Sequence, residues 1–190
     1  MSAGNHAQGL AYSGTKLGIN THIVMPLGTP FTKIRRTKNF GGKVYLEGND
    51  LIESNNYVNT LKDKFGFIEV HPYNDEEVIK GQGTIYFEMA KQVSKLDYLL
   101  VPVGGGGLIA GCSIVNSHIS KNTKIIGIET KSYPSLYNNF YNKNLNCHGS
   151  TIAEGIAVKE IGEIPYFFIK NNIDDVICVS DTSIEQAIAI

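Results

Sequence analysis

Four consecutive glycines, Gly104 to Gly107, constrain the fold more than any other feature of the sequence. They follow residues 97–103 (DYLLVPV), which predict a strand buried on both faces of a parallel sheet. A helix is predicted to start at Leu108. Without Cβ atoms, several backbone N–H groups can converge at the start of this helix, where partial positive charge favours an anion. The loop therefore predicts a bound phosphate, with a tightly packed strand–helix turn as the alternative.

Strand-like and helix-like segments alternate along the whole chain. Strands are predicted at residues 21–25, 43–46, 67–70, 97–103, 124–129 and 175–179. Helices are predicted at 6–17, from Pro30 as first helical residue, from a cap at Asp50 to about 64, at 75–93 with interruptions at Gly81 and Gly83, at 108–119, and from 182. This alternation predicts an α/β fold with parallel sheets. We place the domain boundary near residues 66–76, which predicts domains 1–68 and 69–190.

Composition excludes several classes of function. The 190 residues carry a net charge of −1, which gives no overall attraction to nucleic acid or acidic membranes. We expect no signal peptide, and no apolar run approaches the ~20 residues that cross a bilayer. The three cysteines, Cys112, Cys147 and Cys178, lack the spacing of a disulfide framework or a metal site. We therefore expect a cytoplasmic protein with no metal, no nucleic-acid partner and no membrane partner.

A second motif stands at the start of the chain, where residues 2–9 read SAGNHAQG. Short polar side chains lie there on a glycine turn just before a helix, and exposed N–H groups would suit a carboxylate. The Asn5 side chain could hydrogen-bond a hydroxyl or phenolate, with helix capping as the competing interpretation. For His6 we prefer an orienting or core role to that of a catalytic base.

The glycine loop alone leaves a dinucleotide site open. Gly105, Gly107 and Ala110 fit the G-x-G-x-x-A fingerprint, and Glu129 ends the next predicted strand, where a ribose-binding carboxylate would lie. That alternative predicts an NAD-dependent dehydrogenase. Its fingerprint does not require four glycines in a row, whereas a single phosphomonoester held by the whole loop explains all four.

Together the two motifs resemble the fold-type II enzymes that use pyridoxal 5'-phosphate, and among them the threonine dehydratases. The similarity covers essentially the whole chain, in SAGNHAQG at 2–9, IVMP at 23–26, HPYNDEEVIKGQGTI at 71–85, VPVGGGGL at 101–108 and IAEGIAVK at 152–159. The resemblance implies a tryptophan-synthase-β-like fold, truncated at both ends. Residues 1–68 would be part of a small αβα domain, and 69–190 part of a large domain that binds the cofactor phosphate.

The resemblance also implies roles for residues at matching positions. The loop that receives the substrate carboxylate would comprise Ser2, Gly4, Asn5 and His6. Asn5 would also hydrogen-bond the cofactor's ring oxygen, and Gly155 would lie near the ring. Backbone N–H groups would hold the cofactor phosphate at Gly104, Gly105, Gly106, Gly107 and Leu108. The implied reaction is β-elimination of L-threonine to 2-oxobutanoate and ammonia, with L-serine giving pyruvate.

Two departures separate the chain from the serine racemases of this fold, which are a further alternative. Those enzymes carry a second serine as acid/base where this chain has Ala3. They also hold a divalent cation, and this chain has Ser135 where a carboxylate would be needed. Both differences favour a dehydratase without a metal site.

The resemblance places the Schiff-base lysine upstream of residues 2–9, and the partner of the pyridine nitrogen beyond Ile190. No lysine present, Lys16 and Lys159 included, stands in the family's lysine motif. We therefore assign no catalytic residue and expect a fragment that is inactive alone, with an inactive truncated remnant as the alternative. The intact enzyme would be a homo-oligomer in cytoplasmic amino-acid metabolism, such as isoleucine biosynthesis. Uncovered apolar surface on the fragment predicts self-association.

Overall fold

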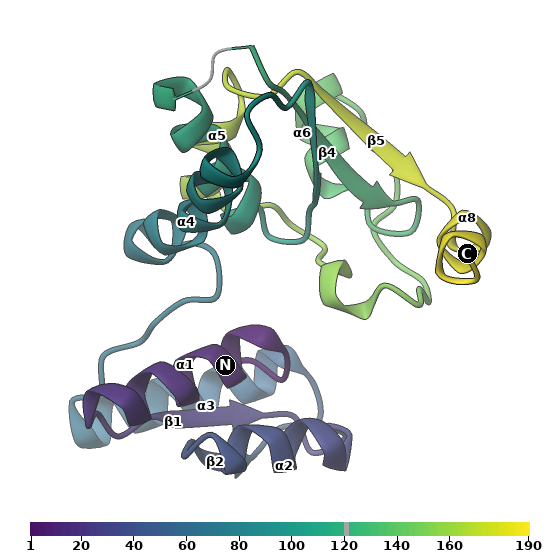
Figure 1. Cartoon of the computed structure of the whole chain (residues 1–190). Coiled ribbons are helices and arrows are strands. Elements are labelled where there is room, and N and C mark those ends of the chain that lie inside the picture. Colours follow the sequence, from purple (N-terminus) through teal and green to yellow (C-terminus); the bar gives the residue numbers. More distant parts are fainter. Residues whose placement is uncertain (120–121) are drawn as a thin grey trace. The chain divides into compact units, whose positions relative to one another are not determined.

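The computed structural model describes residues 1–119 and 122–190, without the side chains of Leu51 and Ile52. The chain divides into two compact units, Met1–Pro72 and Tyr73–Ile190 (Figure 1). Each unit contains one parallel β-sheet with helices packed against it, which confirms the predicted α/β class.

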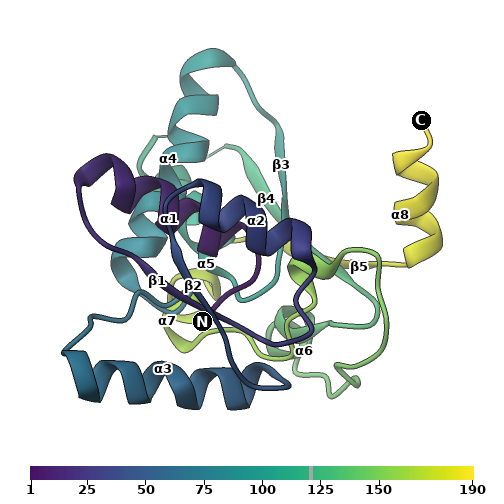
Figure 2. The same cartoon turned by 90° about the horizontal axis from the view of Figure 1, so that it is seen from below.

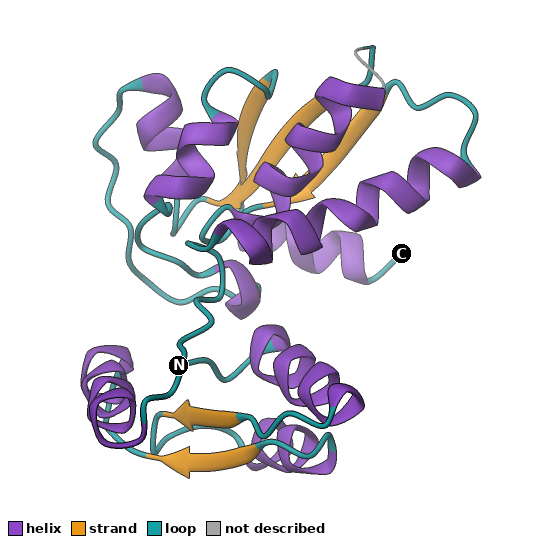
Figure 3. Ribbon diagram, turned by 90° about the vertical axis from the view of Figure 1, so that its left-hand side faces the viewer, coloured by secondary structure: helices purple, strands orange, loops and turns teal. Residues whose placement is uncertain are grey.

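The first unit is a two-stranded sheet between helices. Its elements are α1 (Asn5–Leu17), β1 (His22–Met25), α2 (Phe31–Asn39), β2 (Lys43–Leu46) and α3 (Leu51–Phe65). β1 and β2 are parallel, with His22 opposite Lys43 and Met25 opposite Leu46. Helices α1 and α2 lie on one face of this sheet and α3 lies on the other (Figures 2 and 3). The sheet is therefore covered on both faces.

Two helix ends in the first unit follow the predicted capping chemistry, and a third does not. Helix α1 stops at Gly18, whose φ of 70° is the left-handed conformation that glycine adopts without steric cost. The Asp50 carboxylate accepts a hydrogen bond from the Glu53 N–H at 2.8 Å, at the start of α3. Pro30 was predicted as the first helical residue, but it is the residue before α2, which begins at Phe31. Its ψ of 134° is extended rather than helical.

The strand predicted at residues 67–70 is wrong, because this segment joins no sheet. Side chains attach it to the first unit instead. The Phe67 ring packs on His22 with ring centroids 4.3 Å apart. The Glu69 carboxylate accepts a hydrogen bond from the Lys62 ammonium at 2.6 Å. The largely apolar segment 67–70 is thus held in place by side-chain contacts without forming a strand.

The second unit is a three-stranded sheet in the order β3–β4–β5, with all strands parallel. The strands are β3 (Tyr98–Pro102), β4 (Lys124–Thr130) and β5 (Asp175–Val179). The helices are α4 (Glu76–Gln92), α5 (Gly107–Ile119), α6 (Ser135–Tyr141), α7 (Glu163–Ile169) and α8 (Asp181–Ile188), with a 3₁₀ turn η1 at Glu154–Ile156. The strands and helices predicted for this unit are present in the predicted order, but α6, η1 and α7 between β4 and β5 were not predicted.

One face of the second sheet is covered and the other is not, in the part of the chain that the structure describes. Leu99 and Val101 of β3 are buried in the core, whereas Tyr98 and Leu100 are 57% and 62% exposed. On the covered face, a Cβ atom at Gly127 of β4 would touch side chains of both α5 and α6. The prediction that β3 is buried on both faces is therefore wrong.

Helix α4 is continuous from Glu76 to Gln92, so the predicted interruptions at Gly81 and Gly83 are also wrong. Gly83 instead lets α4 approach α5 closely. A Cβ atom there would lie 2.9 Å from the carbonyl oxygen of Gly111 on α5, and one at Gly111 would lie 2.5 Å from the Gly83 nitrogen. The two helices therefore cross with their backbones in contact.

Candidate functional site

The glycine loop connects the carboxyl end of β3 to the start of α5. This is the edge of a parallel sheet at which α/β proteins bind their ligands. Gly104 is half-buried, and Gly105, Gly106 and Gly107 are buried. Gly106 has a φ of 92°, a conformation that residues with a side chain rarely adopt.

The space beside three of these glycines is filled by other side chains. A Cβ atom on Gly105 would lie 2.2 Å from the ring of Tyr73, and one on Gly107 would lie 3.1 Å from the Tyr73 Cβ. A Cβ on Gly106 would lie 2.4 Å from the Ile161 side chain. The alternative explanation for the glycines, a tightly packed strand–helix turn, is therefore correct in part.

Packing does not explain why the backbone N–H groups of the loop lack hydrogen-bond acceptors. In residues 1–119 and 122–190, nothing accepts a hydrogen bond from the N–H groups of Gly104, Gly105, Gly106, Gly107 or Leu108. Val103 on one side donates to the Ile128 carbonyl at 2.8 Å and Ala110 on the other donates to the Gly106 carbonyl at 3.0 Å, while the Ile109 N–H between Leu108 and Ala110 also has no backbone acceptor among the described residues. Buried N–H groups without an acceptor are rare in native proteins. Gly105, Gly106 and Gly107 are buried, and a run of such donors at a helix start fits an anion such as a phosphate.

Gly155 lies beside this loop. A Cβ atom on Gly104 would be 3.3 Å from the Ile156 Cα and 3.6 Å from the Gly155 carbonyl oxygen. Gly155 belongs to the turn η1 and is itself exposed. The structure thus brings Gly155 together with the glycine loop.

The motif at residues 2–9 forms a turn and the first part of α1 in the first unit. The Ser2 N–H donates to the Val24 carbonyl at 3.2 Å, and the Gly4 N–H donates to the Ser2 hydroxyl at 3.3 Å. Gly4 is the residue that precedes α1, and no side chain caps the helix. The capping interpretation of Asn5 is therefore wrong. Its side chain is exposed and makes no hydrogen bond within the described parts of the chain.

His6 and Ala3 have structural contacts. The His6 Nε2 atom lies 2.9 Å from the carbonyl oxygen of Val70, which accepts its hydrogen bond. This contact supports the orienting role that we preferred for His6. Ala3 packs against the apolar core of the first unit.

Glu129 is fully buried, and its carboxylate caps the start of α6. One oxygen accepts from the Ser135 hydroxyl at 3.1 Å and from the Leu136 N–H at 2.7 Å, while the other accepts from the Tyr137 N–H at 2.8 Å. Burial raises the pKa of this carboxyl group, and the backbone donors oppose that rise. Since both oxygens are used internally, the interpretation of Glu129 as a ribose-binding carboxylate is wrong. Ser135 is its hydrogen-bond donor.

Sequence reasoning missed Tyr73 as a residue of this site. It stands within the stretch 71–85, where it showed no pattern beyond an aromatic residue shortly before the helix cap Asp75. Only the structure reveals that its ring lies against Gly105, far along the chain.

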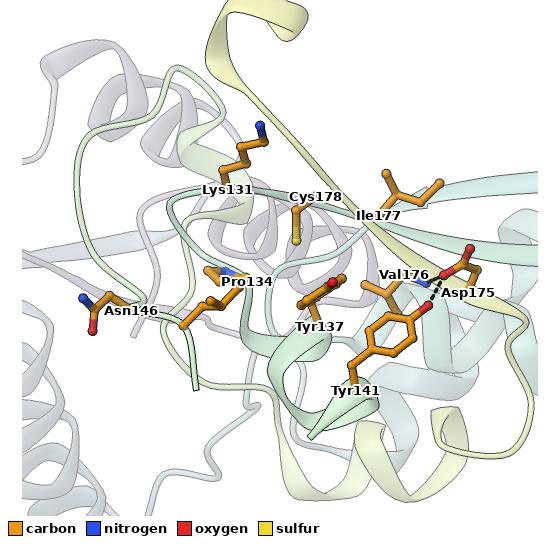
Figure 4. Close-up of a pocket in the computed structure, with 10 residues that line it drawn as sticks. Lys131, Pro134, Tyr137, Tyr141, Asn146, Asp175, Val176, Ile177 and Cys178 are labelled. Atoms are coloured by element: carbon orange, nitrogen blue, oxygen red, sulfur yellow. Dashed lines mark hydrogen bonds between the residues drawn. The ribbon is translucent and has the colours of Figure 1, made fainter. Parts of the chain in front are cut away.

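A surface pocket of about 650 Å³ lies elsewhere in the second unit, beside β5 and α6 (Figure 4). Tyr137 and Tyr141 form its apolar wall, and the Tyr141 hydroxyl donates a hydrogen bond to Asp175. None of the predicted site residues lines it. Across the described residues, no group of three or more His, Cys, Asp or Glu side chains is placed to hold a metal ion. No described helix is both long enough and apolar enough to span a membrane.

Comparison with known proteins agrees with this geometry. The chain is 39% identical over 189 residues to L-threonine ammonia-lyase of Thermotoga maritima, covering 98% of this chain and 47% of the relative. It is 41% identical over 188 residues to the catabolic L-threonine dehydratase TdcB of Staphylococcus aureus, covering 98% of this chain and 54% of the relative. The chain thus spans about half the length of the curated relatives it matches.

Solved structures show the same fold. The processed form of threonine deaminase isoform 2 from Solanum lycopersicum matches with a TM-score of 0.92 and 38% identity, over 99% of this chain and 52% of that one. Maize serine racemase matches with a TM-score of 0.93 and 30% identity, over 99% and 57%. The fold is that of the tryptophan-synthase-β-like enzymes. The family profile described as "Pyridoxal-phosphate dependent enzyme" matches residues 1–190, and the chain therefore belongs to this family of enzymes.

Proposed function

We propose that the chain is part of a threonine dehydratase, in which pyridoxal 5'-phosphate serves the β-elimination of L-threonine to 2-oxobutanoate and ammonia. The observation that carries this proposal is that the N–H groups of residues 104–108 have no acceptor among the residues that the structure describes. It fits the phosphate of the cofactor, and relatives at about 40% identity are named for this reaction. We assign residues 1–68 to the small domain and 69–190 to the large domain.

Each candidate residue has a defined task in this proposal. The N–H groups of Gly104 to Leu108 bind the phosphate, and Gly155 lies near the cofactor ring. The loop at residues 2–6 receives the substrate carboxylate, because a helix start offers backbone donors to an anion. The exposed amide of Asn5 is available to hydrogen-bond the ring oxygen. When bound, the cofactor supplies an electron sink for the electrons released at the substrate Cα.

Elimination is favoured over racemisation by the residue between Ser2 and Gly4. Ala3 has no proton to donate, and its methyl group packs against the core of the first unit. We accordingly propose L-serine as a second substrate that yields pyruvate without racemisation. The proposal includes a cytoplasmic homo-oligomer that acts in amino-acid metabolism, with isoleucine biosynthesis as one setting.

The first experiment titrates the 190-residue chain with pyridoxal 5'-phosphate and, separately, with reduced nicotinamide cofactor. We expect binding of the former, read by its absorbance and by equilibrium dialysis. The second experiment measures release of 2-oxobutanoate from threonine, and the chirality of recovered serine, in the longest protein that the gene encodes. Nicotinamide binding without pyridoxal phosphate binding contradicts the proposal, as does absence of any keto acid from both amino acids.

A further inference from the structure

Tyr73 packs against three glycines that lie in two separate loops, with its ring against Gly105 and Gly162 and its Cβ and backbone against Gly107. A Cβ atom would approach Tyr73 to 2.2 Å at Gly105, to 3.1 Å at Gly107 and to 3.0 Å at Gly162. Gly162 immediately precedes α7, and its N–H donates to the Gly105 carbonyl at 3.1 Å. One aromatic side chain therefore packs against both loops at the point where they are hydrogen-bonded together.

The backbone around Tyr73 is held by its neighbours in sequence. The Asn74 side-chain oxygen accepts from the Ile164 N–H at 2.9 Å, which ties this segment to the start of α7. The Asp75 carboxylate accepts from the N–H groups of Glu77 and Val78 at 2.9 and 3.1 Å, which ties it to the start of α4. Hydrogen bonds of Asn74 and Asp75 therefore hold the backbone next to Tyr73 in place. Burial raises the pKa of the Tyr73 phenol, so the side chain adds no negative charge beside the loop at neutral pH.

We propose that Tyr73 is a positioning residue for the phosphate-binding loop, acting as the surface against which Gly104 to Gly107 take up their conformation. It contacts the loop and not the phosphate. By filling the space beside Gly105, its side chain holds the loop where the Gly105 carbonyl accepts from the Gly162 N–H. In this conformation the N–H groups of residues 104–108 have no acceptor in the described part of the chain. This inference rests on the proposed function only in naming the phosphate as that of pyridoxal 5'-phosphate.

The test compares Tyr73→Phe with Tyr73→Leu in the 190-residue chain. Phenylalanine keeps the planar ring, so we expect affinities for pyridoxal 5'-phosphate and for inorganic phosphate within about twofold of the wild type. Leucine leaves the loop unsupported. Because N–H groups that bind an anion must be held within about 0.5 Å, we expect both affinities to fall about tenfold or more. Circular dichroism verifies that each variant is folded.

A second variant keeps the inference testable if Tyr73→Leu does not fold. Gly162→Ala places a methyl group 3.0 Å from the Tyr73 ring, 3.0 Å from the Asn74 side-chain oxygen and 2.9 Å from the Pro165 ring, and leaves the sequence of residues 104–108 unchanged. We expect it to shift the ring and weaken phosphate binding severalfold. The matched control is Gly81→Ala on α4, where a Cβ meets no described atom within 4 Å. We expect this control to leave the affinity for phosphate unchanged.

The outcomes separate the inference from the proposed function. Wild-type affinity in folded Tyr73→Leu or Gly162→Ala overturns the positioning role and leaves the dehydratase proposal intact. Binding of inorganic phosphate that depends on Tyr73, without binding of pyridoxal 5'-phosphate, supports the positioning role and contradicts the proposed function. A wild-type chain that binds neither ligand overturns both.

Discussion

Two glycine turns precede helices in this chain, and they use glycine for different reasons. In the first unit, a Cβ atom on Gly4 would meet no described atom within 4 Å. In the second unit, the space beside Gly105 and Gly106 is already filled by Tyr73 and Ile161. The space beside Gly4 is open to a ligand. At Gly104–Gly107, by contrast, side chains of the same unit occupy the space that the missing Cβ atoms leave. Glycine at a helix start is therefore evidence of a site only after its neighbours are known.

The largest expected difference in stability is between two single variants, each of which adds one methyl group to one of the two turns. Gly106→Ala combines a φ of 92° with a contact of 2.4 Å to Ile161. We expect it to lower the free energy of unfolding by about 3–5 kcal/mol. Gly4→Ala should change it by less than about 1 kcal/mol, since its φ is −115° and the space is open. Urea titration of both variants measures the difference, and equal losses would contradict the comparison.

The second unit also depends on a buried charge that the first unit lacks. Among the described residues, Glu129 is the one fully buried carboxylate. Glu129→Gln replaces one of the two acceptor oxygens by an NH2 donor, so one N–H group at the start of α6 loses its acceptor, and we expect a loss of about 1–3 kcal/mol. Equal urea midpoints for this variant and the wild type would refute the capping role.

Stability should also respond to pH through Glu129. Because burial raises its folded-state pKa, the folded chain binds this proton more tightly than the unfolded chain. The contribution of Glu129 therefore falls as pH rises from the ordinary carboxyl value through the raised value. Glu129→Gln should flatten that part of the curve of unfolding free energy against pH. Glu88→Gln on the exposed surface of α4 is the control and should leave the curve unchanged.

A smaller effect, on self-association, is expected from the difference between the exposed faces of the two sheets. The first sheet lies between helices, while the second exposes Tyr98, Leu100 and Ile177 on one face. Exposed apolar surface of this kind favours association. Leu100→Lys should reduce self-association in sedimentation velocity, and Leu17→Lys on exposed α1 should not. A monodisperse wild-type monomer would contradict this expectation.

The smallest effect on stability is expected at Asn5. Its side chain caps nothing, so Asn5→Ala should change the free energy of unfolding by no more than about 0.5 kcal/mol. The same substitution should weaken binding of pyridoxal 5'-phosphate, since the proposed bond to the ring oxygen is lost. Thermal melts with and without the cofactor measure both quantities. A large loss of stability without cofactor would assign Asn5 a structural role instead.

Local chemistry made much of the fold predictable. Asp50 and Gly18 mark helix ends through interactions within a few residues, and the alternation of strands and helices follows from short-range hydrophobic patterns. The glycine loop was predictable as a strand–helix connection for the same reason, because a run of glycines disfavours the interior of either element.

The errors share a physical cause, which is contact between residues distant in sequence. Residues 67–70 have a strand-like pattern but no neighbouring strand, and β3 has an apolar pattern but one bare face. Glu129 stood where a ribose ligand would be expected, and only the fold brings the start of α6 to it. The packing of Tyr73 on Gly105 likewise depends on tertiary structure.

The crossing of α4 and α5 at Gly83 and Gly111 bears on how the second unit folds. With no side chain between the two backbones, the helices fit together in one register, and a slipped pairing would place larger residues in direct collision. We therefore expect α4 and α5, with the strand β3 between them in the chain, to dock together. In native-state amide exchange, these three elements should open as a single cooperative unit, after the exposed helix α8 has already exchanged.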